Sequence, residues 1–279
     1  MKKIAFAAAL LAAAGVAHAD FKTPTIEGTG ITVANYGTAL SLQTATPGFG
    51  TTLQLGELYV ANDATNLYVG IAGNNANNNS GIYIFIDSVT GGATTLEPNT
   101  AGGYDVFDDL AATGNGLLPA SFTLNTALNI KSTTNATSLG SWDLISNAAT
   151  YRGDAGTYTG GFNVGVDNSN ASSTPFTAGA VSTGIEVQIP RTEIGSPANG
   201  ATIKIFASSG NFTKGGNAAN YMSNQVIPNP GTAGNFGNDG AGGSGGNGLN
   251  YNGTGGPNIT PASYVMAAPS SVNDWAILE

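Results

Sequence analysis

The chain of 279 residues contains no cysteine and only one histidine, His18. The absence of cysteine excludes disulfide bonds, thiolate nucleophiles and thiolate metal ligands. His18 lies in an N-terminal segment that we expect to be removed, so the mature chain has no imidazole to act as a general base or to bind haem or zinc. We therefore expect neither haem nor zinc as a cofactor.

Charged residues are scarce as well, at 9% of the chain, against roughly 25% in an ordinary domain. Hydrophobic residues make up 41% and form runs of strand length, which argues against disorder. Glycine, asparagine, threonine and serine take the place of charged residues on the expected surface. Such a surface suits neutral partners, either a glycan or other copies of the same chain.

Residues 1–19 have the pattern of a secretory signal peptide. Lys2 and Lys3 precede an apolar run from Ile4 to Val16, and Ala17-His18-Ala19 supplies the small residues of a cleavage site. The run is shorter than the roughly 20 residues that span a bilayer. We expect cleavage before Asp20, no transmembrane segment afterwards, and a bacterial protein of the periplasm, the cell surface or the medium.

The mature chain is acidic, with 6 basic and 17 acidic residues and a net charge of −11. This charge repels phosphate backbones, so we expect no binding to nucleic acid. Carboxylate oxygens are the ligands that calcium prefers, so a calcium ion is compatible with the composition.

Apolar residues alternate with a period of two, which is typical of β-strands. Ile82–Asp87 is apolar on both faces and predicts a central strand, whereas Ile185–Ile189 alternates so strictly that we expect one buried and one solvated face. Ala201–Ala207 predicts another strand, and Gly56–Gly73 predicts a hairpin with its turn at Asn62–Asn66.

These segments predict one all-β domain over residues 20–279, an antiparallel, jelly-roll-like β-sandwich with long Gly/Asn-rich loops. Weaker strands are expected at residues 122–130, 141–146, 161–166 and 264–267, and single helical turns at 106–112 and 192–195. Residues 231–256 are so rich in glycine and small polar residues that we expect a mobile loop.

Five aspartates on the expected loops are candidate metal ligands. Asp105, Asp108 and Asp109 fall within five residues, and Asp63 and Asp87 follow predicted strands. Carboxylates this close repel one another unless solvent or a cation separates them. The spacing fits either a calcium site or an ordinary solvated loop.

Aromatic and amide residues are the candidate ligand contacts. Trp142 and Trp275 each neighbour an aspartate and could stack on a sugar ring, or each could pack in the core. Tyr221, Asn224 and Gln225 precede the glycine-rich loop and form either a ligand rim or the exit of a strand.

Catalysis has little support in the sequence. A pair of carboxylates can hydrolyse a glycoside without histidine or cysteine, but no local motif marks such a pair. No S-x-x-K motif supplies a lysine base for a serine nucleophile. We therefore expect a protein that is not an enzyme.

The hairpin resembles a known family. Gly56–Gly70 (GELYVANDATNLYVG), followed by Ile82–Asp87 (IYIFID), is similar to the opening of DOMON-like and family 9 carbohydrate-binding-module-like domains, and Ile185–Gly195 resembles one of their later strands. The resemblance implies a jelly-roll-like sandwich, often with structural calcium, that binds sugar or haem. Its haem branch uses Met and His ligands, and its sugar branch uses paired tryptophans, for which Trp142 and Trp275 are the candidates.

Two functions remain open from the sequence. The first is a secreted or cell-surface binding module for carbohydrate, stabilised by calcium. The second is a structural protein of the cell envelope or of an extracellular fibre, in which the segment Asp20–Leu42 adds to the sheet of a neighbouring copy.

Overall fold

A computed structural model describes residues 21–46, 53–75, 80–95, 118–133, 136–143, 148–154, 156–170, 176–211, 222–229 and 259–269. The expected signal peptide at 1–19, the expected mobile loop at 231–256 and the expected helical turn at 106–112 lie outside these residues. Within them, no helix is long and apolar enough to cross a membrane.

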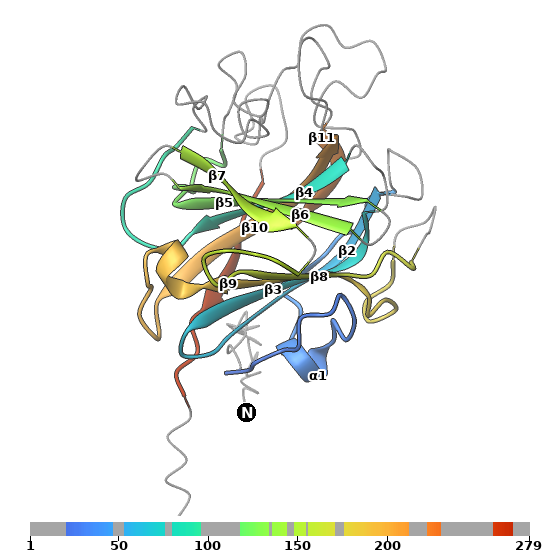
Figure 1. Ribbon diagram of the computed structural model, residues 1–279, viewed down its shortest axis with the longest axis horizontal. Coiled ribbons are helices and arrows are strands. Elements are labelled where there is room, and N and C mark those ends of the chain that lie inside the picture. Colours follow the sequence, from blue (N-terminus) through green and yellow to red (C-terminus); the bar gives the residue numbers. More distant parts are fainter. Residues whose placement is uncertain are drawn as a thin grey trace, which may run out of the picture.

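The described residues form two antiparallel β-sheets that lie face to face (Figure 1). The first sheet has five strands in the order β1-β2-β3-β9-β8, with bounds β1 Ser41–Leu42, β2 Leu53–Asn62, β3 Asn66–Asn75, β8 Asn163–Val166 and β9 Gly184–Pro190. A single α-helical turn, α1 (Val33–Tyr36), lies on its outer face. The predicted hairpin is confirmed as β2 and β3, with Asn62 opposite Leu67.

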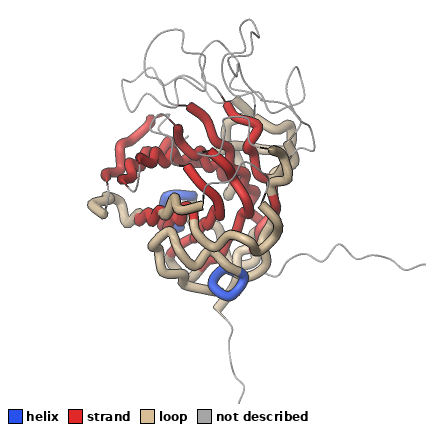
Figure 2. The backbone as a smooth tube through the Cα atoms, turned by 90° about the vertical axis from the view of Figure 1, so that its right-hand side faces the viewer, coloured by secondary structure: helices blue, strands red, loops and turns tan. Residues whose placement is uncertain are grey.

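The second sheet has seven strands in the order β11-β10-β4-β5-β6-β7, and β12 also pairs with β10. The bounds are β4 Ser80–Asp87, β5 Thr126–Thr133, β6 Ala136–Asp143, β7 Ala148–Asp154, β10 Thr202–Asn211, β11 Met222–Ile227 and β12 Ala262–Val265. A 3-10 helix, η2 (Arg191–Ile194), follows β9 and confirms the helical turn expected there. Figure 2 shows the strands in the middle of the molecule and the loops at their ends.

The core lies between the sheets, as the alternating pattern predicts. Ile82, Ile84 and Ile86 of β4 point inward and are almost fully buried, with relative exposures of 1%, 0% and 0%. Tyr83 and Phe85 lie on the other face of the strand, where Phe85 stacks on Phe206 with ring centroids 4.6 Å apart. The sequence therefore correctly predicted a central strand buried on both faces and an all-β sandwich.

The prediction that one face of β9 is solvated is wrong at Glu186. Glu186 of β9 is fully buried, because residues 21–36 cross the outer face of the five-stranded sheet and cover it. Its carboxylate accepts hydrogen bonds from the backbone N–H groups of Glu27 (3.0 Å) and Gly28 (2.7 Å) and from the Tyr36 hydroxyl (2.8 Å). The segment Asp20–Leu42, proposed above for strand addition to another copy, is thus bound from residue 21 onward to the sheet of its own chain.

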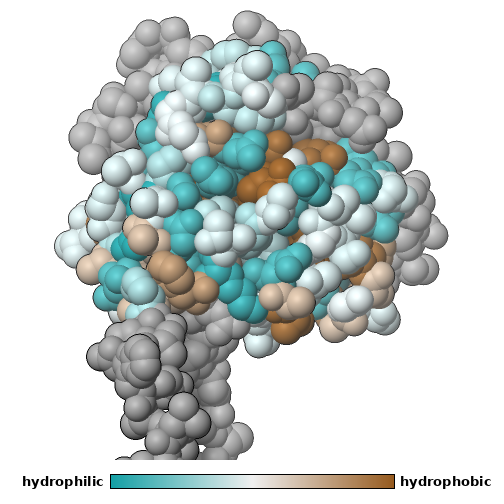
Figure 3. All heavy atoms as spheres, turned by 60° about the horizontal axis from the view of Figure 1, so that its bottom comes forward, coloured by the Kyte–Doolittle hydropathy of each residue, from teal (hydrophilic) through white to brown (hydrophobic). Residues whose placement is uncertain are grey.

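Two glycines make room for this segment. Gly70 and Gly165 are the residues opposite Glu186 on the neighbouring strands. A Cβ atom at Gly165 would lie 2.5 Å from the Gly28 nitrogen, and one at Gly70 would lie 3.0 Å from the Tyr36 ring. Figure 3 shows this side of the molecule, where hydrophilic side chains surround separate apolar patches.

Two glutamine side chains join the sheets along one edge. Gln225 of β11 accepts from the Leu55 N–H (3.1 Å) and donates to the Ala45 carbonyl (3.1 Å), and Gln43 donates to the Val226 carbonyl. The Leu55 N–H lies where β2 has a bulge. The glutamine amides therefore replace backbone pairing between β11 and the β1–β2 edge.

Candidate functional site

Three adjoining hollows lie at the end of the sandwich where η2 leads from β9 to β10 (gold, Figure 1). Their volumes are about 720, 550 and 260 Å³. Ser196 lines the two larger hollows, and Thr90 lines both the largest and the smallest. We call the three hollows together the groove; it is built by the β2–β3 turn, the loop after β4, the loop before β5 and the β9–β10 connection.

The groove is lined mainly by neutral groups that form hydrogen bonds. Among the described residues that line it, none is aromatic. Within the described part of the chain, four charged residues line it: Asp87, Arg191, Glu193 and Lys204. The hydroxyl and amide side chains in the lining are Thr65, Asn66, Ser88, Thr90, Thr123, Asn125, Thr126, Thr192, Ser196, Asn199 and Thr202.

The loop after β4 is held in place by Asn125. Its Oδ1 accepts from the N–H groups of Ser88 (2.7 Å) and Val89 (3.0 Å), and its Nδ2 donates to the Gly91 carbonyl (2.9 Å). The Ser88 hydroxyl donates to the Ile194 carbonyl of η2 at 2.6 Å. These bonds tie two walls of the groove together, which favours a preformed site.

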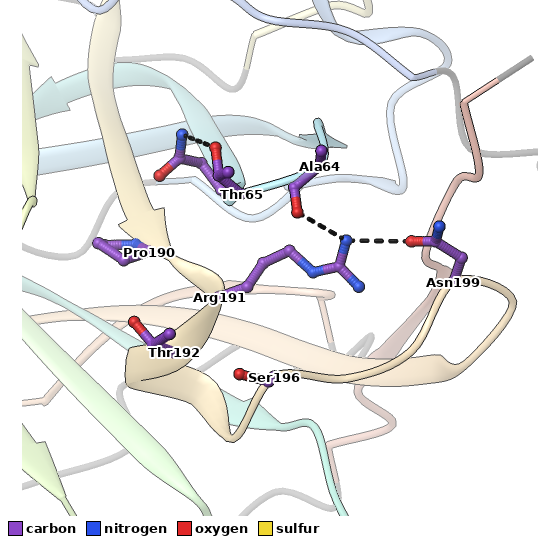
Figure 4. A pocket seen from close by; sticks show the side chains of 8 residues that line it. Ala64, Thr65, Pro190, Arg191, Thr192, Ser196 and Asn199 are labelled. Carbon is purple, nitrogen blue, oxygen red and sulfur yellow. Dashed lines mark hydrogen bonds between the residues drawn. The ribbon is translucent and has the colours of Figure 1, made fainter.

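Arg191 connects the β2–β3 turn to the β9–β10 connection (Figure 4). Its Nη1 donates to the Ala64 carbonyl (3.3 Å) and to Asn199 Oδ1 (3.0 Å), and its Nη2 donates to the Pro197 carbonyl. The guanidinium therefore lies across the 550 Å³ hollow and fixes its shape.

Ser196 has an uncommon backbone conformation, with φ of 54°. It follows Gly195, which also has a positive φ, and its N–H donates to the Arg191 carbonyl at 2.7 Å. A non-glycine residue in this region carries strain of about 1–2 kcal/mol. Residues held in such conformations cluster at functional sites, which supports assigning the site to this groove.

Asp87 and Lys204 form the ionic pair of the largest hollow. They stand directly opposite each other on β4 and β10, with Asp87 Oδ2 3.6 Å from Lys204 Nζ. Thr123 donates to the carboxylate through its N–H (3.2 Å) and its hydroxyl (3.1 Å). Asp87, one of the predicted metal ligands, thus lies in the groove beside a cation of the protein itself.

Asp63, another predicted ligand, caps the β2–β3 turn. Its Oδ1 accepts from the N–H groups of Thr65 and Asn66, both at 2.7 Å, and its Oδ2 accepts from the Tyr68 hydroxyl. Burial opposes ionisation, but the hydrogen bonds from Tyr68, Thr65 and Asn66 lower the pKa of Asp63 to about 2. Burial and the same contact raise the pKa of Tyr68 to about 12.

Among the described residues, no three His, Cys, Asp or Glu side chains come together as a metal site would require. Asp105, Asp108 and Asp109 lie outside those residues. The calcium site therefore stays a prediction.

The predicted aromatic and amide contacts have different outcomes. Gln225 is fully buried, and its amide joins the two sheets. Trp142 lies in β6 opposite Ala127, and Asn224 lies in β11, but their side chains are outside the described part. Trp275 and Tyr221 lie outside the described residues altogether.

For several groove residues, no sequence pattern indicated that they belong to a binding site. Lys204 was visible only as the charged residue of an alternating strand, and Thr123 and Ser196 as polar residues of loops. Arg191 follows Pro190 at the end of a predicted strand, which is the one local signal that could have directed attention to this connection. The other residues come together through pairing of strands that are distant in the sequence.

No family model matches the chain, and no curated protein matches it. The resemblance of the hairpin to DOMON-like and family 9 carbohydrate-binding-module-like domains therefore stays a prediction, and the groove itself is the basis for assigning a function.

Proposed function

We propose that the protein is an exported, non-catalytic binding module whose groove at the η2 end of the sandwich holds a carbohydrate. The observation that carries the proposal is the lining of this groove. Hydroxyl and amide groups from four connections converge there on a rigid two-sheet framework. Neutral donors and acceptors of this kind complement the hydroxyl groups of a sugar.

The charges in the groove support binding rather than hydrolysis. Glu193 is paired with Arg152 at 2.5 Å, and Asp87 lies near Lys204. Each carboxylate of the described lining is thus engaged by a basic side chain of the protein itself. A glycosidase needs two carboxyl groups that are free to act on the glycosidic bond from either side.

The expected export agrees with this function, because a binding module of the cell surface or medium meets glycans there. The protein forms its core without disulfide bonds, which is consistent with its size and with the absence of cysteine.

The test is the retention of the purified mature protein on soluble polysaccharides in affinity gels and by calorimetry. A double variant, Thr90→Leu and Thr202→Leu, replaces two hydroxyls of the largest hollow with larger apolar groups. Losing two neutral hydrogen bonds should weaken binding about tenfold or more. The control is Thr150→Leu on the exposed surface of β7, which should bind as the wild type does. Equal binding by the double variant would place the ligand elsewhere.

A second candidate function is assembly through strand edges. β7 is the last strand of the seven-stranded sheet, and Tyr151 on it is 47% exposed. An open strand edge can pair with another chain. Electron microscopy separates the two functions: filaments of the purified protein support assembly, and a monodisperse monomer supports the binding module.

A further inference from the structure

Asp87 and Lys204 are close but do not form a direct hydrogen bond. The separation of 3.6 Å between Asp87 Oδ2 and Lys204 Nζ exceeds the usual limit for such a bond. Both side chains are partly open to solvent, with exposures of 15% for Asp87 and 38% for Lys204. The pair therefore presents an acceptor and a donor side by side in the largest hollow.

The loop before β5 holds the two groups in these positions. Thr123 binds both oxygens of Asp87, and Lys204 donates to the Ser121 carbonyl. Phe122, which lies between Ser121 and Thr123 in the sequence, is 1% exposed and contacts Phe206 edge-on with ring centroids 5.1 Å apart. A buried aromatic anchor thus fixes the loop, and the loop binds the carboxylate and the ammonium separately, through Thr123 and Ser121.

The opposite charges of Asp87 and Lys204 determine which class of ligand fits between them. The Lys204 ammonium would repel a metal ion, and the Asp87 carboxylate would repel an anion. A neutral group with one donor and one acceptor in adjacent positions satisfies both side chains. Two neighbouring hydroxyls of a sugar ring have this property, because one donates to the carboxylate while the other accepts from the ammonium.

We propose that Asp87 and Lys204 together bind a vicinal diol, so that the preferred glycans are those whose chain residues keep two adjacent ring hydroxyls free. This inference rests on the proposed carbohydrate-binding function and specifies its substrate class. It assigns specificity to Asp87 and Lys204, whereas the surrounding threonines, serines and asparagines contribute contacts that any sugar can make.

The first experiment compares three kinds of soluble polysaccharide in affinity gels. Xylan and mannan keep adjacent free hydroxyls in their chains. Their periodate-oxidised and borohydride-reduced forms have lost the ring bond between those hydroxyls. Laminarin, linked mainly through carbon three, has internal residues without two adjacent free hydroxyls. We expect retention on native xylan or mannan, and at most weak retention on the oxidised forms and on laminarin.

The second experiment uses Asp87→Asn and Lys204→Met with the retained polysaccharide. Hydrogen bonds to charged groups are stronger than neutral ones, so each variant should bind about ten- to a hundredfold more weakly. Asp154→Asn and Lys131→Met change the same charges on β7 and β5, away from the groove, and should leave affinity unchanged. Circular dichroism confirms that each variant is folded.

The outcomes separate the two proposals. Equal retention on laminarin and xylan, or unchanged affinity in both folded groove variants, overturns the diol assignment but leaves carbohydrate binding in place. No retention on any polysaccharide of the panel overturns both. Strong loss in both groove variants, together with selective binding of native xylan or mannan, supports the vicinal diol as the recognised group.

Discussion

The buried carboxylate of Glu186 gives the sharpest test of how the N-terminal segment is held on the sheet. Three donors of that segment meet it: the N–H groups of Glu27 and Gly28, and the Tyr36 hydroxyl. Glu186→Ala removes their common acceptor. Glu186→Gln keeps the shape, because its amide oxygen can accept the two N–H groups while its NH₂ donates to the Tyr36 oxygen.

The expected magnitudes follow from this count. A buried donor left without an acceptor costs about 1–2 kcal/mol, so three donors predict a loss of roughly 3–6 kcal/mol in Glu186→Ala. Glu186→Gln should lose less than about 1 kcal/mol at low pH, because the protonated carboxyl group and the amide both accept from the two N–H groups through one oxygen and donate to the Tyr36 oxygen.

The pH dependence has a definite direction. Burial raises the pKa of Glu186 above its ordinary value of 4.5, against the hydrogen bonds from Glu27, Tyr36 and Gly28, which favour ionisation. The protonated group contributes its full stabilisation below pH 4.5, and this contribution is lost as the pH rises through the raised pKa. Docking of the segment in the wild type should therefore weaken as the pH rises. In Glu186→Gln the contribution of this residue should not change with pH.

Hydrogen exchange of the Glu27 and Gly28 amides reports this docking directly, after correction for the intrinsic pH dependence of exchange. Denaturant unfolding at about pH 5 and about pH 8 gives the accompanying free energies. Protection that increases with pH in the wild type would mean that the ionised carboxylate is the docked form. A loss in Glu186→Gln as large as in Glu186→Ala would show that the charge, not an acceptor, is required. Either result refutes the reasoning.

Three further predictions concern other parts of the molecule. Gln225→Ala leaves the Leu55 N–H and the Ala45 carbonyl unpaired and should lower the free energy of unfolding by about 2–4 kcal/mol, whereas Gln188→Ala, near the surface, should change it by less than about 1 kcal/mol. Asn129 is fully buried and its amide has no partner among the described residues, so Asn129→Val should raise stability by about 1–2 kcal/mol in urea unfolding; a loss would indicate that bound water satisfies the amide. If calcium binds at Asp105, Asp108 and Asp109, it should raise the melting temperature, and replacing these three by Asn should abolish that shift; coincident melting curves with calcium and with chelator would reject the site.

The alternating pattern predicted most of the fold because it reflects local geometry. Side chains two residues apart share a face of a strand, so Ile82, Ile84 and Ile86 identify a core face without knowledge of the partner strands. Turn formers at Asn62–Asn66 likewise fix the hairpin from adjacent residues alone. These features need no information about distant parts of the chain.

The same pattern failed at Glu186 because a distant segment decides its environment. Residues 27 and 28 are 159 and 158 positions from Glu186 in the sequence. No residue near β9 in the sequence indicates that they cross its outer face. Gly70 and Gly165, on the strands beside Glu186, are the traces that this crossing leaves in the sequence. Glycine within a strand indicates close approach of another backbone but does not say which one.

The candidate site was predictable only in part. Asp63 was correctly placed in the β2–β3 turn, but Asp87 is the last residue of β4, and its partner Lys204 lies on a strand more than a hundred residues later. The predicted ligand contact Gln225 is polar and follows a tyrosine in a short polar run, but it forms part of the framework. Residue type alone does not distinguish an amide that binds a ligand from one that binds the backbone.

The scarcity of charge makes the groove pair informative. Several charged side chains elsewhere in the described part of the chain are closely engaged within the protein: Glu186 with backbone N–H groups, Asp63 with its own turn, Arg191 with carbonyls and Arg152 with Glu193. Asp87 and Lys204 differ from these five, because each is anchored on one side by the 121–123 loop while the gap between them is too long for a hydrogen bond. A pair spaced in this way retains hydrogen-bonding capacity toward the groove. That capacity is what a ligand with adjacent hydroxyls would use.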